Sequence, residues 1–316
     1  MVLTLWKMEN EIMKIIKPSV EFYGAVPTEY NAALKFIELA GRTCYKSEDK
    51  ITETSAEGFV RKLIKAGHLA MVEHSNFVVK RSSNEISETS TAIIQAGKYL
   101  NICGSEDDML YVGGSLTAWY NRLVELQSIL AEKKYLDMFR PFWTAYGLLF
   151  SADDNFDGAF NSAASLPTLW KVCPPNEIPK ELHRYSAKFI CDRGVSHELV
   201  RHRTCSFAQE STRYVNYGGK DMEFIEPDGF GRWNWTDEDV FLRSCAQSEK
   251  WYNLLLEGKT RTHQQARAVL PNALKTEIVV TADAVEWAHI RKLRTAKAAH
   301  PDMQRVMNMV PWEEFL

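Results

Sequence analysis

The chain has 316 residues, of which 38 are Lys or Arg and 41 are Asp or Glu, so its formal net charge is −3. Apolar residues make up 45% of the chain and charged residues 25%, which is typical of a globular protein and excludes a disordered chain, a collagen-like chain and a disulfide scaffold. Because the net charge is close to zero, the protein lacks the excess of positive charge that attracts nucleic acid non-specifically, and we expect no nucleic-acid partner.

The spacing of apolar residues predicts helices and strands that do not alternate as βαβ units. No glycine-rich phosphate loop of the Rossmann or P-loop type is present. This mixture indicates the α+β class. In chain order we expect an irregular leader at 1–12, a strand at 13–23, helices at 31–45 and 54–66, a strand at 73–80, helices at 115–131 and 134–150, a strand at 185–191, helices at 195–202, 236–257 and 261–269, a strand at 276–281, a helix through 287–293 and a last helix that opens at 300–301.

No segment is apolar over the roughly 18 residues that a membrane span requires. The N-terminus carries several charges and no small-residue cleavage site, so it does not resemble a signal peptide. We therefore expect a cytoplasmic protein without a membrane partner. The six cysteines form no C-x-x-C pair, which predicts reduced thiols and no metal site.

The densest polar segment is 201–214, where three arginines, a histidine and several hydroxyl groups fall together. The planar guanidinium of arginine suits phosphate and carboxylate groups, and hydroxyls and turn amides would complete an anion site. On composition alone a solvated charged loop is about as good an interpretation. Phe207, Tyr214 and Tyr217 favour a partly buried loop, in which the arginines need partners.

Near this segment, His197 and His202 resemble the histidine pair of a zinc-protease helix. That motif needs histidines four residues apart on one helical face. Here they are five apart, about 140° around a helix. The sequence therefore excludes a zinc-protease site.

Two further clusters carry candidate functional side chains. Residues 67–74 hold two histidines and a glutamate at a helix end, where each histidine is more readily a hydrogen-bonded structural residue than a catalyst. Near the C-terminus, Arg267 and Arg294 stand beside apolar neighbours, where an unpaired guanidinium would be costly. A salt bridge to Glu277 or another carboxylate and a bound ligand are equally good explanations for both.

Taken together, these residues resemble the flavin-dependent thymidylate synthase family. Its signature, R-H-R followed after seven residues by S, is met by residues 201–203 and Ser211. The flanks match as well, over about 13–81 and 182–310. The supporting motifs are Arg42-Thr43-Cys44-Tyr45, Gly67-His68, Glu73-His74, residues 191–200, Ser211-Thr212-Arg213-Tyr214, Ala266-Arg267, Leu270-Pro271, Thr276-Glu277 and Leu293-Arg294.

The resemblance implies the reductive methylation of dUMP to dTMP. Methylenetetrahydrofolate would supply the carbon, FAD would carry the hydride and NADPH would reduce the flavin. It also implies a homotetramer whose active sites draw residues from several subunits. The implied fold is a mainly antiparallel twisted sheet packed with helices, like that of the thymidylate synthase complementing proteins.

The resemblance also assigns site residues by position. The residues expected around dUMP are Glu198, Arg201, Gln209, Glu210, Ser211, Thr212, Arg213, Arg267 and Arg294, with Arg294 as the catalytic residue. The residues expected around FAD are His68, Ala70, Arg201, His202, Arg203, Gln209, Asp283, Val285 and His289.

Arg294 matches the arginine that contacts the uracil and favours its N3-ionised form. A guanidinium held at that edge stabilises the enolate-like charge that loads electron density onto C5. The Pro-Cys-His setting of the ordinary thymidylate synthase is absent, because Cys173 precedes a proline. No histidine at motif spacing serves as a base for Cys205, so we interpret this cysteine as a packing residue.

The chain departs from the family pattern at several positions. Ala70 replaces a usual Ser or Thr, and Val285 replaces a usual arginine, so two flavin contacts lose their polar side chains. A stretch of about 100 residues, 82–181, is added, and we expect it to be a largely helical insertion on the rim or at a subunit contact. The synthase domain is then discontinuous, formed by 13–81 and 182–316.

Two other functions remain open. A non-catalytic nucleotide- or flavin-binding homologue would keep the phosphate loop and lose turnover through the changes at Ala70, Val285 and the insertion. An RNA-binding protein using the basic segment 201–213 is a weaker hypothesis, given the net charge.

Overall fold

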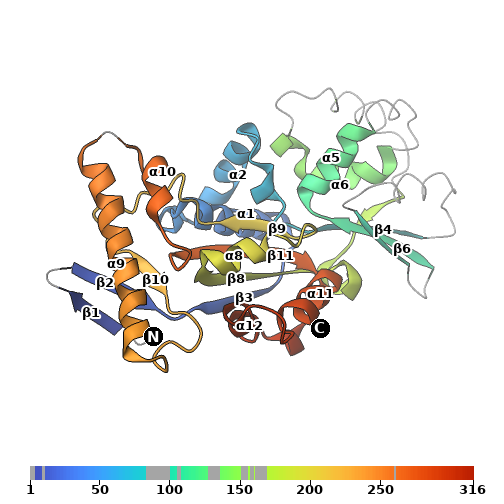
Figure 1. The fold of residues 1–316 in the computed structure, drawn as a ribbon. Coiled ribbons are helices and arrows are strands. Elements are labelled where there is room, and N and C mark those ends of the chain that lie inside the picture. Colours follow the sequence, from blue (N-terminus) through green and yellow to red (C-terminus); the bar gives the residue numbers. More distant parts are fainter. Residues whose placement is uncertain are drawn as a thin grey trace.

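The computed structural model describes residues 4–8, 11–82, 100–104, 108–126, 136–150, 156, 160, 169–259 and 261–316. In these ranges, mainly antiparallel sheets pack with helices (Figure 1), which confirms the α+β class. Parts of the expected leader and insertion lie outside the described residues.

A four-stranded antiparallel sheet forms the centre of the molecule (Figure 1). Its longest pair, β8 with β11, is in register from Lys275 opposite Asp192 to Asp283 opposite Arg184. Residues 276–282 of β11 are all buried, as their β-branched, apolar sequence predicts for a strand covered on both faces. The sheet order is β3 (Ser19–Ala25), β8 (Arg184–Asp192), β11 (Lys275–Asp283) and β9 (Ser206–Gln209).

Both long strands end in an aspartate that starts the next helix. The Asp192 carboxylate accepts a hydrogen bond from Val195 N at 2.8 Å and caps α8 (Arg193–Leu199). The Asp283 carboxylate accepts one from Glu286 N at 2.8 Å and caps α11 (Ala284–Arg294). Such caps satisfy N–H groups that the first helical turn leaves unpaired. The first cap explains why α8 begins before the expected residue 195; the helix also ends earlier than expected, at Leu199.

A second sheet combines a synthase-domain strand with strands of the expected insertion. Its order is β5 (Asn101–Gly104), β6 (Met109–Gly114), β4 (Phe77–Ser82) and β7 (Lys171–Val172). The described part of the expected insertion contains α5 (Leu116–Glu125) and α6 (Leu136–Phe150), and it also holds three strands that the sequence did not predict. β6 and β7 pair with the two edges of β4, and β5 pairs with β6, so this sheet depends on long-range pairing that local periodicity does not report.

The insertion shares one hydrophobic core with the helices around it. Trp119 of α5 and Phe142 of α6 are fully buried together with Ile37 and Val60. Those last two side chains belong to α1 (Tyr30–Tyr45) and α2 (Ser55–Lys65), whose bounds agree with the expected helices to within one residue. The short helix α3 (Leu69–Val72) completes this layer.

A third sheet lies at the other end of the molecule (Figure 1). The expected strand at 13–23 is in fact two strands, because Lys17-Pro18 interrupts the pairing. Part of the expected irregular leader is a strand paired with the first of them. The sheet contains β1 (Thr4–Met8), β2 (Glu11–Ile16) and β10 (Glu223–Ile225), with β2 and β10 parallel.

The remaining helices follow the sequence predictions closely. The expected helix at 261–269 is a short α10 followed by a 3-10 turn at Arg267–Val269. The expected strand at 73–80 starts only at Phe77, because residues 74–76 are buried polar groups.

In the described part of the chain, no helix has both the length and the apolar character needed to cross a bilayer. The other helices are α9 (Trp235–Glu257), α10 (His263–Ala266) and α12 (Pro301–Met307).

Candidate active site

The C-terminal ends of α8 and α11 meet on one face of the central sheet. Val195 and Leu199 of α8 and Trp287 and Ile290 of α11 are buried in the same core cluster as the inward side chains of β8 and β11. Because β8 and β11 are antiparallel, the helices that follow them start at opposite ends of the sheet and run toward each other. This topology brings together side chains that are about 100 residues apart in sequence.

Four of these side chains form one continuous polar chain. Arg294 donates from Nη1 to Glu198 Oε2 at 2.5 Å and from Nη2 to the Glu198 carbonyl at 3.0 Å. Its Nε donates to His202 Nε2 at 3.0 Å. The other ring nitrogen of His202, Nδ1, lies 3.0 Å from Glu286 Oε1. The order is therefore Glu286, His202, Arg294, Glu198.

This order fixes the protonation state of the histidine. Since Nε2 accepts from the guanidinium, the proton of a neutral imidazole resides on Nδ1 and is donated to Glu286. Burial lowers the pKa of His202, and the positive charge of Arg294 lowers it further, against the opposing effect of Glu286. His202 is thus held as a neutral acceptor that orients Arg294.

Arg294 keeps donor capacity while it is held. A guanidinium carries five N–H groups, and the contacts with Glu198 and His202 use three of them. One N–H remains on Nη1 and one on Nη2, and the side chain is 14% exposed. The salt bridge expected as one explanation for this arginine exists, with Glu198 as the partner, and it leaves a pair of donors for a ligand.

The other expected substrate residues gather on the segment after β9. Arg267 donates from Nη1 to Thr212 Oγ1 at 3.2 Å, and the Ser211 hydroxyl accepts from the Arg213 N–H at 3.2 Å. Within the described ranges, neither Arg213 nor Arg267 has an ion-pair partner, and both are exposed. Glu277, the suggested partner of Arg267, pairs with lysines instead. Two exposed guanidinium groups beside two hydroxyl groups suit a phosphate.

An aromatic contact joins this segment to the first histidine segment. The Tyr45 hydroxyl lies 2.6 Å from His68 Nδ1, and the ring centroids of Tyr45 and Tyr214 are 5.2 Å apart. His68 and Ala70 are both exposed. Through Tyr45, the structure therefore brings His68 close to Tyr214 in the segment after β9, and no contact among the described residues joins it to His202.

Gln209 and Glu210 point into the protein interior. Gln209 Nε2 donates to Ser196 Oγ at 2.8 Å and to Thr276 Oγ1 at 3.2 Å. The Glu210 side chain is 2% exposed; its carboxylate accepts from the Tyr217 hydroxyl at 2.7 Å and pairs with Lys275 at 3.3 Å. The Glu210 oxygens are therefore engaged in a buried ion-pair cluster, and its expected role at the substrate stays a prediction.

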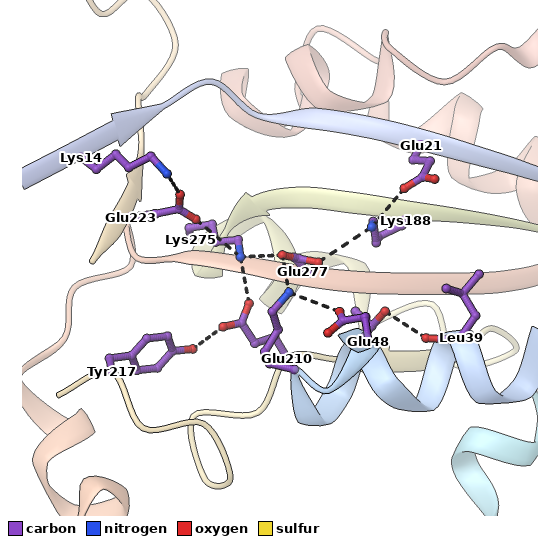
Figure 2. Close-up of polar contacts among 12 residues, drawn as sticks. Lys14, Glu21, Leu39, Glu48, Lys188, Glu210, Tyr217, Glu223, Lys275 and Glu277 are labelled. Atoms are coloured by element: carbon purple, nitrogen blue, oxygen red, sulfur yellow. Dashed lines mark hydrogen bonds and ion pairs between the residues drawn. The ribbon is translucent and has the colours of Figure 1, made fainter. Parts of the chain in front are cut away.

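Figure 2 shows this ion-pair cluster, in which Lys275 is central. Lys275 Nζ lies 2.6 Å from Glu277, 3.3 Å from Glu210 and 3.7 Å from Glu223. Burial alone would raise the pKa of Glu277, but the charges of Lys275 and Lys46 outweigh it and lower this pKa to about 2. Burial would lower the pKa of Lys275, yet the surrounding carboxylates raise it. The ion pairs of Lys275 with Glu277 and Glu210 therefore link β11 to the segment that follows β9.

His74 is a structural histidine of the core. Its side chain is fully buried, and Nδ1 lies 2.8 Å from Thr281 Oγ1, whose hydroxyl donates to Ser186 Oγ at 2.8 Å. Because the Thr281 proton is committed, Nδ1–H of His74 is the donor. Burial lowers the pKa of His74 to about 3, with a further effect from the nearby Arg184.

We expect His74 to make the protein acid-sensitive. Its folded-state pKa lies below its unfolded value of about 6.5, so the stability that the neutral form contributes is present above pH 6.5 and is lost as the pH falls toward 3. The loss should be about 1.4 kcal/mol per pH unit. Urea unfolding between pH 7 and pH 4.5 measures this slope, with His74→Asn as the comparison. Equal slopes in both proteins would contradict the assignment.

A polar cavity of about 330 Å³ opens beside the R-H-R motif. Arg203 and Asp283, both expected at FAD, line it with Cys205. Arg203 has no hydrogen-bond or ion-pair partner among the described residues and is exposed, so its guanidinium is available to a phosphate. The size is that of a ligand pocket for part of a dinucleotide. These residues fit a flavin dinucleotide.

The remaining expected flavin residues contribute less. Val285 is 71% exposed and carries no polar group, so its side chain cannot replace the usual arginine. The His289 ring stands 5.7 Å from that of His202 in an edge contact. Arg201 is exposed. Burial raises the pKa of Cys205 far above its ordinary value, so this thiol stays protonated, in keeping with a packing role.

One group of side chains could approach a metal ion. Ligand atoms of His202, Glu286 and His289 all lie within 4.8 Å of one another. However, both ring nitrogens of His202 are already in hydrogen bonds, and one of these comes from the positive guanidinium of Arg294. A second cation at this point would meet direct electrostatic repulsion. We therefore assign no metal to this group.

Sequence reasoning missed two contributors to these sites. Glu286 belongs to no motif that the sequence analysis singled out. It lies in the first turn of α11, whose start is set by the capping residue Asp283, and this position was the available sign that its side chain is held in place. Arg184 begins β8 and lines the cavity. Its guanidinium donates to the carbonyls of Glu73 and Ser75 at 2.5 and 2.7 Å, contacts that no local pattern indicates.

Known proteins resemble the second part of the chain. Residues 176–313 match the family model described as thymidylate synthase complementing protein. The flavin-dependent thymidylate synthase of Corynebacterium efficiens is 36% identical over 131 residues, which cover 36% of this chain and 50% of that protein. The enzyme of the same name from Thermococcus onnurineus is 33% identical over 127 residues, covering 37% and 47%. The chain thus spans about half the length of the curated relatives it matches.

One solved structure that this chain resembles is the UMP/dUMP methylase PolB from Streptomyces cacaoi, bound with 5-Br dUMP. The two sequences are 16% identical, and the match covers 95% of this chain and 91% of the PolB chain. The TM-score is 0.38, which is too low to inform function. The family match instead comes from sequence and includes β8, the R-H-R segment, β11 and α11. Residues 176–313 of this chain are thus similar to the thymidylate synthase complementing proteins, and the relatives that match it are flavin-dependent thymidylate synthases.

Proposed function

We propose that this protein is a flavin-dependent thymidylate synthase that converts dUMP to dTMP. Methylenetetrahydrofolate is the proposed carbon donor, FAD the hydride carrier and NADPH the reductant. The observation that carries the proposal is the polar chain at the meeting of α8 and α11, in which Arg294 is oriented by Glu198 and His202 and retains two N–H donors. The relatives' names supply the reaction.

In this proposal the chain's own residues bind and polarise the nucleotide. Arg213 and Arg267, with the hydroxyls of Ser211 and Thr212, hold the phosphate of dUMP. The two remaining N–H groups of Arg294 donate to the uracil edge, stabilise negative charge at N3 and its neighbouring oxygen, and so raise electron density at C5. The hydrogen bonds to His202 and Glu198 keep the guanidinium aimed at the uracil while this charge develops.

The flavin residues take a second part of the site. Arg203 and Asp283, which line the cavity, are the proposed contacts. His68 and His289 are further proposed flavin residues. When bound, FAD supplies the hydride that completes the methyl group, and the protein supplies binding and orientation. No cysteine adduct at C6 is proposed, since the Cys205 thiol is buried and protonated.

The proposed assembly is a homotetramer with active sites at subunit interfaces. The phosphate-binding residues Arg213 and Arg267 and the histidine segment at His68 are exposed in one protomer, as residues that meet a neighbouring subunit would be. The proposed synthase domain comprises 13–81 and 182–316, interrupted by the insertion at 82–181 and preceded by an extension at 1–12.

An assay with the purified protein tests the proposal. We expect a flavin absorbance spectrum that changes when dUMP is added. We also expect tritium release from [5-³H]dUMP in the presence of NADPH and methylenetetrahydrofolate. The exposed Val285 and the side chain lost at Ala70 favour one rival, a flavin-binding homologue without turnover. Flavin binding without tritium release would support that rival and refute the synthase.

A further inference from the structure

The cavity beside the R-H-R motif has two walls that come from different parts of the chain. One wall belongs to the synthase domain and includes Glu73, Arg184 and Asp283, with residues 203–206. The other wall belongs to the insertion: Asn101 from β5, the end of β6, and Ser115, Thr117, Ala118 and Asn121 around the start of α5. The insertion, for which the family resemblance implies no role, therefore closes the cavity that the expected flavin residues open.

Direct hydrogen bonds fasten the insertion to both expected flavin segments. Asn101 Nδ2 donates to Asp283 Oδ2 at 3.2 Å. Thr117 Oγ1 donates to the Leu69 carbonyl at 3.1 Å, between His68 and Ala70. The two segments that lack their usual polar side chains, at Ala70 and Val285, are thus the two that the insertion touches.

The insertion wall is rigid on the side that faces the cavity. The Ser115 hydroxyl caps α5 by accepting from Ala118 N at 3.1 Å. Two residues after Thr117, the fully buried Trp119 donates from Nε1 to the Phe77 carbonyl at 2.9 Å. Because α5 is locked into the shared core, polar groups on its cavity side are held in place before any ligand arrives, which reduces the cost of binding.

The chemistry of the cavity suits an anionic, hydroxyl-bearing ligand. Arg184 donates only to two carbonyls and to Ser206 Oγ, so within the described residues its positive charge has no ion-pair partner. Arg203 adds a second guanidinium. Burial raises the pKa of the Glu73 carboxyl group, which stands on the same wall. Amide and hydroxyl groups on the opposite wall can bond sugar or ribityl hydroxyls.

We propose that the insertion forms part of the flavin site, with Asn101 and Asn121 contacting the phosphate- and hydroxyl-bearing chain of the dinucleotide while Arg184 and Arg203 face its phosphates. This inference rests on the proposed function. In this proposal, polar groups of the insertion take the place of the polar side chains that are missing at positions 70 and 285, and the flavin keeps polar contacts on that side of the cavity.

Fluorescence titration with FAD and with riboflavin, which lacks phosphate groups, tests the proposal. We expect Asn121→Leu and Asn101→Ala each to weaken FAD binding about tenfold or more, as expected for losing a hydrogen bond to a charged group. Riboflavin binding should be weaker than FAD binding in the unaltered protein. Glu125→Leu is the matched control, because it also adds a leucine to α5 but does not line the cavity, and it should bind FAD like the unaltered protein.

The outcomes separate this inference from the proposed function. Unchanged FAD affinity in both asparagine variants, with normal circular dichroism, would overturn the inference and leave the synthase proposal intact. Asparagine-dependent FAD binding without dTMP formation would support the inference and refute the synthase. A protein that binds no FAD at all would overturn both.

Discussion

Replacing Arg294 with alanine should lower the rate of dTMP formation by about 10²- to 10³-fold, the effect of losing one preorganised donor at a developing charge. The side chain is held by Glu198 and His202 at the end of α11, and its remaining N–H groups are the proposed contacts with the uracil. The fold should persist, since this position is at a helix end and outside the core cluster. Tritium release from [5-³H]dUMP measures the rate, and circular dichroism checks the fold.

Arg291 provides the matched control on the same helix. It pairs with Glu313 at 2.7 Å and is partly exposed on α11 away from the polar chain, so Arg291→Ala should retain nearly full activity. Arg294→Lys should recover little, because a lysine keeps the charge but cannot satisfy Glu198 and His202 in the same fork geometry. Full activity in Arg294→Ala would exclude the role proposed for this arginine.

The framework of the site could be predicted because its signals are local. The β-branched run of β11 and the apolar spacing of α11 define a strand followed by a helix. Asp192 and Asp283 stand at typical cap positions, and they set where α8 and α11 begin. A strand and its capped helix depend mainly on neighbouring residues, and those elements were found nearly in full.

The contacts within the site could not be predicted in the same way. His202 and Glu286 are 84 residues apart, and only the antiparallel pairing of β8 and β11 brings them together. Glu210 stands in a motif that is otherwise expected at the substrate. Its side chain nevertheless points inward and pairs with Lys275, which lies 65 residues later in the sequence. Burial of a charge depends on long-range partners, and sequence spacing does not reveal them.

The insertion shows the same limit on a larger scale. Its helices α5 and α6 were expected from their apolar spacing. Its strands were not, because β5 and β6 are short and their sheet is completed only where β6 pairs with β4. A short strand of this kind forms only where another strand offers a free edge to pair with. For β6 that edge belongs to β4, a strand of the synthase domain.

Lys275→Met should lower the free energy of unfolding by about 3–5 kcal/mol, the usual effect of removing one partner from a buried ion pair. The change leaves Glu210 and Glu277, 2% and 9% exposed in their side chains, without their shared counter-charge (Figure 2). Lys46 still faces Glu277, but Glu210 retains only the Tyr217 hydroxyl. Urea unfolding at pH 7 measures the difference from the unaltered protein.

The pH dependence of that difference identifies its cause. The pKa of Glu277 is lowered to about 2 in the folded protein, so the stability from its ion pairs is present above its unfolded value of about 4.5 and is lost as the pH falls toward 2. In Lys275→Met the unpaired carboxylates can take up protons, and the gap between the two proteins should narrow as the pH is lowered from 7 to 4. Lys35→Met, which removes an exposed pair with Glu53, should change stability little at any pH. A gap that stays constant with pH would mean that Lys275 acts through packing of its aliphatic chain and that the cluster of Figure 2 contributes no net electrostatic stabilisation.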